Sequence, residues 1–411
     1  MEKLYGNAVV GQSGGPTAAI NATLSGVIRG ALAASEKGTI GKIYGMRNGV
    51  EGLCEERLVD LGKIFSSEQR FTDLEATPAA ALGSCRKRLP DPLENPLPFE
   101  YILEIFKKYD IRFFFYIGGN DSMDTVQKLS QYTESVGYEM RVIGIPKTID
   151  NDLFGTDHTP GFGSAAKYIA TSVKEILCDC AVYTTKAVTI TEIMGRDAGW
   201  LTAAAALPRL SGGCCPDFIY LPEREFDMDS FFSDVRTALK AHPNVVIAVS
   251  EGIKFSNGTY VCESLPGRKS DAFGHTQLSG TGTCLAIALR EEIGCKTRAV
   301  EFNTSQRCAS HIASRTDIRE SVQIGRRAVE FALRGVSGHM MNFIRSKVGY
   351  KIAIDSVDVR EVANKVRRVP DAFITPSGNN VTDKCLDYLR PLIEGEVRYR
   401  REAGLPVHFK I

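Results

Sequence analysis

The sequence has little that would direct the protein to a membrane or to nucleic acid. No stretch approaches the roughly 18 consecutive apolar residues typical of a membrane-spanning helix. The first residues lack the charged-then-apolar layout of a signal peptide. Lys and Arg number 50 against 49 Asp and Glu, so the formal net charge is +1 and no broad field attracts polyanions. We therefore expect a cytoplasmic protein that binds neither membrane nor nucleic acid.

The cysteines also lack the spacing of a metal site or a redox pair. The chain has 11 cysteines, scattered without a CxxC motif, and its 6 histidines form no HxxxH pair. The closest groupings, Cys178 with Cys180 and Cys214 with Cys215, do not have zinc-ligand spacing. Reduced and mostly buried thiols are the expectation. The chemistry must come from other residue types.

What the sequence does contain is a regular alternation of apolar runs and helical patterns. Buried strands are expected at 7–10, 113–117, 141–145, 187–193, 218–221 and 245–249. Helices are expected at 122–135, 164–177, 228–241 and 283–292. The apolar runs are continuous, which is typical of strands covered on both faces. The pattern predicts an α/β fold with doubly wound, mainly parallel sheets, followed by a C-terminal accessory segment.

Glycine-rich turns follow the first two expected strands. They contain the phosphate-binding candidates Gly14, Gly15, Gly118, Gly119, Asn120 and Asp121. Ligands of parallel sheets gather at the carboxyl ends of strands. Small residues allow a ligand to approach the backbone, and a helix N-terminus favours an anion. Each turn taken alone fits a plain helix-capping turn equally well.

Charged turns follow three further strands. Asp150 and Asp152 stand two residues apart in an extended loop, so their side chains can point the same way. Close packing would raise the pKa of one of them, which suits a general base beside a partner carboxylate. Arg196 and Glu251 follow two other strands, where a buried ion pair is the structural alternative. Five such turns in order are hard to explain by packing alone.

Together these segments resemble the phosphofructokinase family across roughly residues 7–330. The matching motifs are Gly14-Gly15, Gly118-Gly119, Thr148-Ile149-Asp150-Asn151-Asp152, Met194-Gly195-Arg196, Glu251-Gly252 and Gly274-His275. The resemblance implies two doubly wound sheets and Mg²⁺-dependent transfer of a phosphoryl group to the 1-hydroxyl of fructose 6-phosphate.

The resemblance also implies roles for individual residues. Asp150 is expected to take the hydroxyl proton, with Asp152 arranging the site beside it. Thr148 and the glycine turns would hold the transferred phosphate, and Arg196 would neutralise charge as the bond shifts. Arg86 stands where the family has a donor-phosphate arginine, and the residues implied for the sugar phosphate are Met194, Gly195, Glu251 and His275.

Two positions bear on the phosphoryl donor. Members that use ATP carry glycine where this chain has Asp121 and Lys147, whereas members that use pyrophosphate resemble this chain at both. A carboxylate would repel a nucleotide's α-phosphate, and a lysine supplies a cation for compact pyrophosphate. We expect pyrophosphate as donor, with phosphate as product, in a reversible step of glycolysis and gluconeogenesis. An ATP-dependent 6-phosphofructokinase is the alternative.

The chain departs from the family pattern at two sites. Asn120 replaces an aspartate that engages magnesium in many members, so Asp121 is expected to share that duty. Leu278 replaces an arginine that often grips the sugar phosphate. The substitutes proposed for that arginine are Lys186, Lys269 and Arg307, and a surface salt bridge is the alternative for Arg307.

The expected organisation also follows from the resemblance. Residues 1–161 and 277–330 would form the donor domain, and 162–276 the fructose 6-phosphate domain. Residues 331–411 would pack on the second domain. A homodimer or homotetramer is implied, with Lys186 and Lys269 reaching a neighbouring subunit's site. A non-catalytic regulatory relative is a further alternative, as is another substrate such as sedoheptulose 7-phosphate, although Asp150, Asp152 and Arg196 argue for catalysis.

Overall fold

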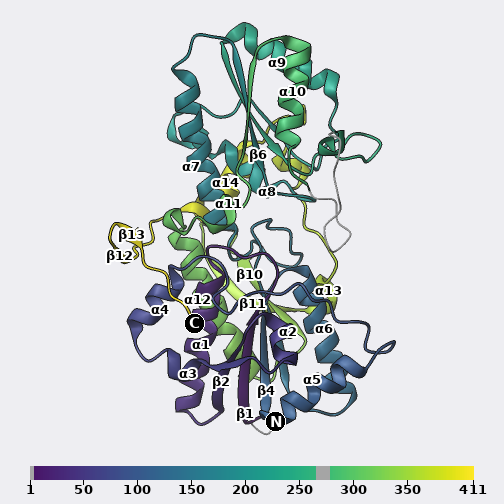
Figure 1. Cartoon of the computed structure of the whole chain (residues 1–411), viewed down its shortest axis with the longest axis vertical. Coiled ribbons are helices and arrows are strands. Elements are labelled where there is room, and N and C mark those ends of the chain that lie inside the picture. The colour runs from purple at the N-terminus through teal and green to yellow at the C-terminus, as the bar shows by residue number, and fades with distance from the viewer. Residues whose placement is uncertain (1–3, 265–277) are drawn as a thin grey trace.

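Two α/β lobes are stacked along the longest axis of the molecule, each built on a mainly parallel sheet (Figure 1). The computed structural model describes residues 4–264 and 278–411. A two-stranded hairpin, β12 (Arg401–Glu402) with β13 (Leu405–Pro406), projects near the C-terminus. The predicted fold class is confirmed, and every expected strand and helix occurs within a few residues of its expected ends.

The large sheet forms the first lobe. Its seven strands run in the order β11 (Ile352–Asp358), β10 (His339–Arg345), β5 (Arg141–Pro146), β4 (Ile111–Gly118), β1 (Gly6–Gln12), β2 (Ile40–Met46) and β3 (Leu58–Asp60). The central pairings from β10 to β2 are parallel. The outermost strands, β11 and β3, are antiparallel to their neighbours. The carboxyl ends of β1, β4 and β5 therefore meet at one edge.

Helices cover both faces of this sheet because alternate side chains of each strand point to opposite faces. In β1, Ala8 and Val10 enter one core and Val9 enters the other. The first core lies under α1 (Ile20–Glu36), α3 (Leu61–Ile64), α4 (Glu68–Glu75) and α12 (Arg315–Leu333). The second lies under α2 (Gly49–Cys54), α5 (Leu97–Lys108), α6 (Asn120–Ser135) and α13 (Val359–Val362).

The small sheet forms the second lobe. Its four parallel strands run in the order β7 (Phe218–Tyr220), β8 (Asn244–Ser250), β6 (Ala187–Ile193) and β9 (Lys296–Glu301). One face is covered by α9 (Met228–Ala241) and α10 (Thr281–Ile293). The other is covered by α7 (Phe162–Ala181), α8 (Trp200–Ala203), the 3-10 helix η1 (Ala204–Ser211), α14 (Asp383–Leu389) and the 3-10 helix η5 (Arg390–Ile393).

The strand order differs from the expected division of the chain in two places. α10 and β9, both expected in the donor domain, belong to the small-sheet lobe, where β9 pairs with β6. β10 and β11, expected in an accessory segment on the second domain, extend the large sheet instead. β9 is an edge strand with few apolar residues, so the sequence gives no sign of the sheet it joins. Only the following stretch, which includes α14, packs on the small-sheet lobe as expected.

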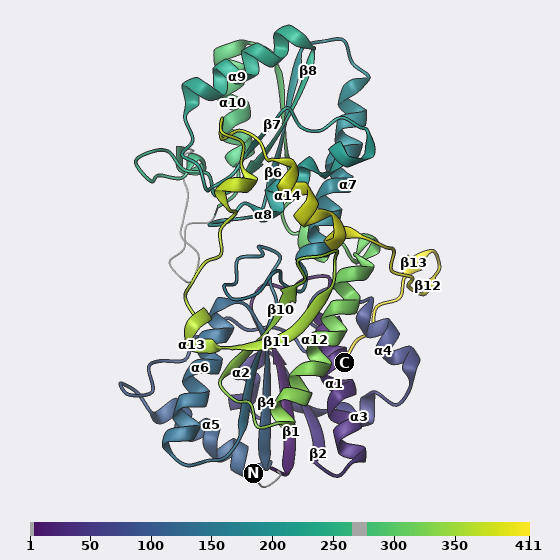
Figure 2. The same cartoon turned by 180° about the vertical axis from the view of Figure 1, so that it is seen from behind.

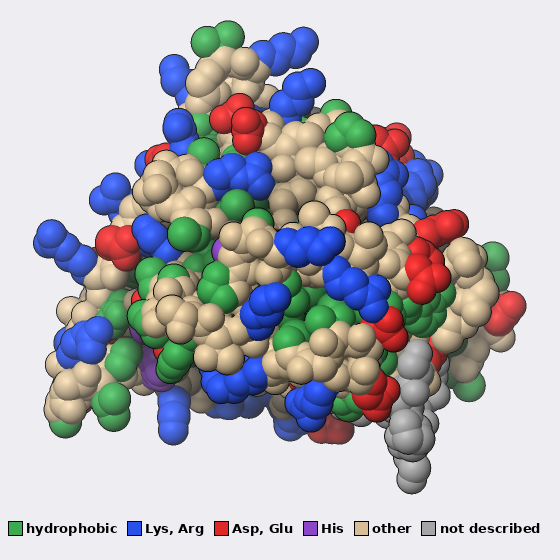
Figure 3. Space-filling view, turned by 90° about the horizontal axis from the view of Figure 1, so that it is seen from above, with side chains coloured by type: hydrophobic (Ala, Val, Ile, Leu, Met, Phe, Trp, Pro, Cys, Tyr) green, Lys and Arg blue, Asp and Glu red, His purple; other side chains and the backbone are tan. Residues whose placement is uncertain are grey.

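On the face seen from above, Lys and Arg side chains are scattered over the surface, and Asp and Glu side chains gather mainly toward one side (Figure 3). None of the helices in residues 4–264 and 278–411 combines the length and the apolar character needed to cross a bilayer.

Candidate active site

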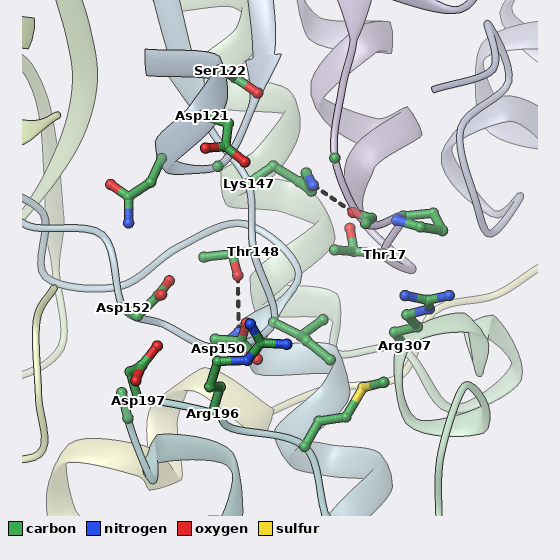
Figure 4. Close-up of a pocket in the computed structure, with 18 of the residues that line it drawn as sticks. Thr17, Asp121, Ser122, Lys147, Thr148, Asp150, Asp152, Arg196, Asp197 and Arg307 are labelled. Atoms are coloured by element: carbon green, nitrogen blue, oxygen red, sulfur yellow. Dashed lines mark hydrogen bonds between the residues drawn. The ribbon is translucent and has the colours of Figure 1, made fainter. Parts of the chain in front are cut away.

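A cavity of about 430 Å³ lies between the two lobes, where the carboxyl ends of both sheets face each other (Figure 4). Parallel sheets place their ligand sites at these strand ends. The predicted site residues that line the cavity are Gly14, Gly15, Arg86, Gly119, Asn120, Asp121, Lys147, Thr148, Asp150, Asp152, Met194, Arg196, Glu251 and Arg307. The structure thus brings together most of the predicted constellation.

The glycine turn after β4 is bonded to the turn that follows β5. The backbone N–H of Lys147 donates to the carbonyl of Gly118 over 3.0 Å, which fixes the turn after β4 against the turn after β5. A Cβ on Gly118 would overlap the hydroxyl of Ser122, so only glycine lets α6 begin this close to the strand. The turn therefore presents the N-terminus of α6 to the cavity, an arrangement that favours anions.

Lys147 spans the space between the turns. Its side chain is only 2% exposed, and its Nζ donates to the carbonyl of Gly15. Burial lowers the pKa of Lys147 to about 8, while the charge of Asp150 acts in the opposite direction. The ammonium group is therefore still the main form near neutral pH. It places a positive charge against the Gly14–Gly15 turn.

Asp150 and Asp152 lie below Lys147 in the loop that follows β5. The backbone N–H of Asp150 donates to Thr148 Oγ1 over 3.1 Å. Burial raises the pKa of Asp150, although Lys147 and Arg196 oppose the shift. Burial, followed by the charge of Asp150, raises the pKa of Asp152 to about 7. Asp152 can therefore carry a proton near neutral pH beside the neighbouring carboxyl group of Asp150.

The small sheet supplies the opposite wall. Glu251, at the end of β8, accepts a hydrogen bond from the backbone N–H of Gly195 over 3.4 Å. Burial raises the pKa of Glu251 to about 8. The N–H of Met194 donates to Gln306 Oε1 over 3.1 Å, and Arg196 points into the cavity near Asp150 (Figure 4). Gln306 belongs to the short helix α11 (Ser305–Cys308).

Basic side chains surround the donor turns. Arg307 also lies on α11, and its Nη1 is 3.5 Å from the position that a Cβ on Gly15 would take. It therefore faces the glycine turn, where its guanidinium can bind an anion. Arg86 lines the cavity from an exposed loop. Arg88, which the sequence did not single out, pairs with Asp121 over 2.8 Å.

The oxygen groups near α6 fit a magnesium ion that is bound partly through substrate. Asn120 Oδ1 is buried and has no hydrogen-bond partner within the described part of the chain. Asp121 stands next to it and lines the cavity. Among residues 4–264 and 278–411, no three His, Cys, Asp or Glu side chains converge as a metal site. Mg²⁺ commonly uses one or two protein oxygens together with substrate phosphates, which suits this donor set.

Some predicted residues do not line the cavity. Gly118 and Gly195 do not line the cavity, but each is next in the sequence to a residue that does. Lys186 precedes β6, at the end of that strand opposite the cavity, and is exposed. Its action in a partner subunit's site stays a prediction. Lys269 and His275 lie outside the described residues. Leu278, which replaces the family's arginine, is buried with 6% exposure.

Seven lining residues were not among the predicted site residues, namely Pro16, Thr17, Ser122, Ile149, Asp197, Ala198 and Val366. Thr17 follows the Gly14–Gly15 turn and Asp197 follows Arg196, so their places beside recognised motifs could have indicated them. Ser122 lies in the first turn of α6 and could have been found in the same way. Val366 comes from the C-terminal segment, where no sequence signal indicated a contact with the cavity.

The cavity belongs to a chain with many recognisable relatives. The sequence pattern of the family described as phosphofructokinase matches residues 7–331. A pyrophosphate–fructose 6-phosphate 1-phosphotransferase from Halomonas elongata is 40% identical over 403 residues, which are 97% of this chain and 94% of that protein. One of the same name from Xanthomonas campestris is 40% identical over 99% of this chain and 96% of its own.

A solved structure agrees with these sequence relatives. The crystal structure of a pyrophosphate-dependent phosphofructokinase from Nitrosospira multiformis superposes with a TM-score of 0.89 at 38% identity. The superposition covers 99% of this chain and 96% of that one. The protein described here therefore belongs to the phosphofructokinase family.

Proposed function

We propose that this protein transfers a phosphoryl group from pyrophosphate to the 1-hydroxyl of fructose 6-phosphate (EC 2.7.1.90). The products are fructose 1,6-bisphosphate and phosphate. One observation carries the choice of donor, namely the buried ammonium group of Lys147 against Gly15. A point charge there suits a small, highly charged donor, and the lysine side chain fills space that a nucleotide would need.

The residues around the pair of aspartates support an in-line transfer. Asp150 accepts the proton of the 1-hydroxyl, and the hydroxyl oxygen forms a bond to the nearer phosphorus of pyrophosphate. The bridging P–O bond breaks, and phosphate leaves with the electron pair. Arg196 neutralises charge on the transferred group, while Thr148 and the glycine turns hold its oxygens. Burial and the charge of Asp150 raise the pKa of Asp152 to about 7, so Asp152 can carry a proton beside the base near neutral pH.

The remaining predicted residues are proposed to orient the substrates. Met194, Gly195 and Glu251 would face the sugar, with His275 and a basic residue at its 6-phosphate. Arg86 would bind the donor and the transferred phosphate. Arg307 remains a candidate for the sugar phosphate in place of the arginine that Leu278 replaces, and its position beside Gly15 also brings it close to the donor turn. Holding both substrates in line supplies much of the rate enhancement in phosphoryl transfer. Since the same arrangement serves the reverse transfer, the step fits both glycolysis and gluconeogenesis.

We propose that Mg²⁺ is required. Asn120 and Asp121 would hold it together with phosphate oxygens, and the ion would neutralise charge on the pyrophosphate. A homodimer or homotetramer in the cytoplasm is also proposed. Light scattering of the purified protein tests the assembly, and variants of Lys186 and Lys269 test whether a neighbouring subunit contributes to the sugar-phosphate site.

A donor assay tests the proposed function directly. Purified protein is incubated with fructose 6-phosphate, Mg²⁺ and either pyrophosphate or ATP, and fructose 1,6-bisphosphate is measured. We expect turnover with pyrophosphate and little with ATP. Turnover with ATP alone would favour the ATP-dependent alternative. Sugar-phosphate binding without turnover by either donor would favour the regulatory relative.

A further inference from the structure

The C-terminal part of the chain, beyond the family match, reaches the loop that carries the two aspartates. Residues 366–388, which we call the C-terminal strap, run from the cavity to α14 on the small-sheet lobe (Figure 2). Val366 lines the cavity and forms a bridge with Leu153. The backbone N–H of Arg367 donates to the carbonyl of Asp152 over 2.7 Å. The strap is thus bonded directly to the backbone of the catalytic loop.

The side chain of Arg367 connects this loop to the other lobe. Its Nη1 donates to the carbonyl of Asn151 over 3.1 Å, so both residues after Asp150 are bonded to Arg367. Its guanidinium lies 4.1 Å from the ring centroid of Trp200, in α8, and Trp200 Nε1 donates to the Arg367 carbonyl over 2.9 Å. α8 follows the Met194–Arg196 turn, so Arg367 ties together the two walls of the cavity.

The hydroxyl of Tyr388 is the centre of the same network. It donates to the carbonyl of Asp157 over 2.7 Å. It accepts from Asn151 Nδ2 over 3.0 Å and from Arg367 Nη2 over 3.2 Å. A phenol has one proton and two lone pairs, so its hydrogen-bonding capacity is filled. Fully satisfied buried networks hold their members in one arrangement.

Asn151 is the residue that such a network must hold. It stands between Asp150 and Asp152, is fully buried, and has a φ of 55°, in the left-handed region. Its Oδ1 accepts from the backbone N–H of Thr159 over 3.1 Å. Non-glycine residues keep such a conformation only where their surroundings enforce it. The relative direction of the two carboxylates depends on this single backbone conformation.

We infer that Arg367 and Tyr388 are positioning residues for the Asp150–Asp152 pair. The strap holds the loop that carries this pair in place against the small-sheet lobe. The inference rests on the proposed function, since it takes the loop to be catalytic. Neither residue lines the cavity, so each acts through Asn151 and the loop backbone. Catalysis by a positioned base is sensitive to displacements of an ångström or less, whereas binding of pyrophosphate to distant turns is not.

The test removes single atoms or groups from the network. Tyr388→Phe deletes one hydroxyl and keeps the ring, and Arg367→Lys keeps the charge but loses the fork of donors. We expect kcat to fall by about 10- to 100-fold, with KM for pyrophosphate within about threefold of the wild type. Because both residues act on one loop, the double variant should lose little more than the worse single variant.

Matched controls separate positioning from general packing. Tyr220→Phe removes a hydroxyl that donates to Asp234 over 2.9 Å, away from the cavity. Arg209→Lys alters an arginine that bonds the strap at the carbonyl of Val381 over 3.2 Å without touching the loop. Both controls should keep kcat within about twofold of the wild type. Strap variants that fold with wild-type kcat would overturn the inference and leave the proposed function intact.

Hydrogen exchange supplies a readout that does not need activity. In Tyr388→Phe, the amides of Thr159 and Arg367 should exchange about tenfold faster or more, because their acceptors belong to Asn151 and Asp152. The same amides should be unchanged in Tyr220→Phe. Unaltered exchange in the strap variants would contradict the inference whether or not the wild type is active. An inactive wild type would by itself refute the proposed function.

Discussion

At the scale of single residues, the cavity brings side chains of opposite charge close together. Lys147 and Arg196 face Asp150 and Asp152, two positive groups against two negative ones. Burial favours the neutral form of each group, which lowers the pKa of the lysine and raises those of the aspartates. The opposite charges act against burial and keep ionised forms available. A base whose pKa is raised in this way takes a proton more readily than an ordinary carboxylate.

Replacing Asp150 should remove the base while leaving the fold intact. Asp150→Asn keeps the shape of the side chain, so we expect kcat to fall by about 10²- to 10⁴-fold with KM for both substrates nearly unchanged. Steady-state kinetics with pyrophosphate measure both quantities. Asp179→Asn, an exposed change at the end of α7, is the control and should keep full activity. An Asp150→Asn enzyme with wild-type kcat would show that another group takes the proton.

The pH dependence of the wild type should report the same pair. Only the deprotonated carboxylate can accept the hydroxyl proton, so kcat/KM should rise with pH until Asp150 has lost its proton. Burial raises the pKa of Asp150 above the usual carboxyl value of 3.8, so the acidic limb should lie above that value. Rates measured in buffers of constant ionic strength test this. The pH should run from about 4 to about 9, roughly the span between ordinary carboxyl and amine pKa values. A flat profile down to pH 4 would contradict it.

The two donor positions give a third prediction at this scale. Asp121→Gly combined with Lys147→Gly removes the carboxylate and the ammonium group that we hold responsible for excluding a nucleotide. The double variant should lose most pyrophosphate activity, by roughly 10-fold or more, and gain measurable turnover with ATP. Arg88→Gln is a useful comparison, because it removes only the partner of Asp121. If the double variant gains no ATP turnover, other residues decide the donor.

Individual site residues could be predicted where they stand in a compact sequence motif, and not where their partners are distant in the sequence. Thr148, Asp150 and Arg196 stand in compact motifs directly after apolar strands, and they do line the cavity. Arg88 and Arg367 were missed because their partners lie far away in the sequence. Nothing within a few residues of Arg367 indicates that it will meet Asn151. Such contacts form only when segments that are distant in the sequence are brought together by folding.

At the scale of elements, α1 and α12 meet without side chains between them. A Cβ on Gly26 would overlap the carbonyl oxygen of Val322, and a Cβ on Gly325 would overlap that of Thr23. The two backbones are therefore in direct contact. α12 also carries Asp317, whose carboxylate accepts from the backbone N–H of Ser164 over 2.9 Å at the start of α7. This helix pair thus links the large sheet to the first helix of the other lobe.

Gly26→Ala should therefore destabilise the protein without touching the cavity. A methyl group at this position forces the two helices apart, and we expect the free energy of unfolding to fall by about 1–3 kcal/mol or more. Denaturant titration followed by circular dichroism measures the change. Gly62→Ala is the matched control, because its nearest contact would be an ordinary 3.4 Å to Asp60. Equal stability of the two variants would contradict the close helix contact.

The elements themselves were predictable where burial dominates the sequence. β4 and β8 are continuous apolar runs, and both were expected from that feature alone. β9 was placed in the wrong lobe because its residues are mostly polar and only Thr297 is buried in it. An edge strand needs little apolar surface, so the sheet that it joins depends on its pairing with a neighbouring strand, here β6. Pairing partners of this kind cannot be read from periodicity.

At the scale of the whole molecule, the chain passes from lobe to lobe several times. It enters the small-sheet lobe before α7, returns to the large-sheet lobe at α12, and crosses again between α13 and α14. The last residues return once more, where Phe409 packs on Phe65 with ring centroids 5.2 Å apart. Because several segments join the lobes and the cavity lies between them, ligand binding should stabilise the molecule as one unit.

Thermal unfolding with ligand tests this expectation and the donor choice together. Pyrophosphate at 100 times its Kd should add about 2.7 kcal/mol to the stability of the folded state. For a chain of 411 residues, an unfolding entropy of about 2.1 cal/mol/K per residue converts this to a rise in Tm of about 3 °C. Asp150→Asn should show the same shift, because it keeps the binding groups and loses only the base. ATP at the same concentration should shift Tm less, since Asp121 and Lys147 oppose a nucleotide. A larger shift with ATP than with pyrophosphate would contradict the proposed donor independently of any activity measurement.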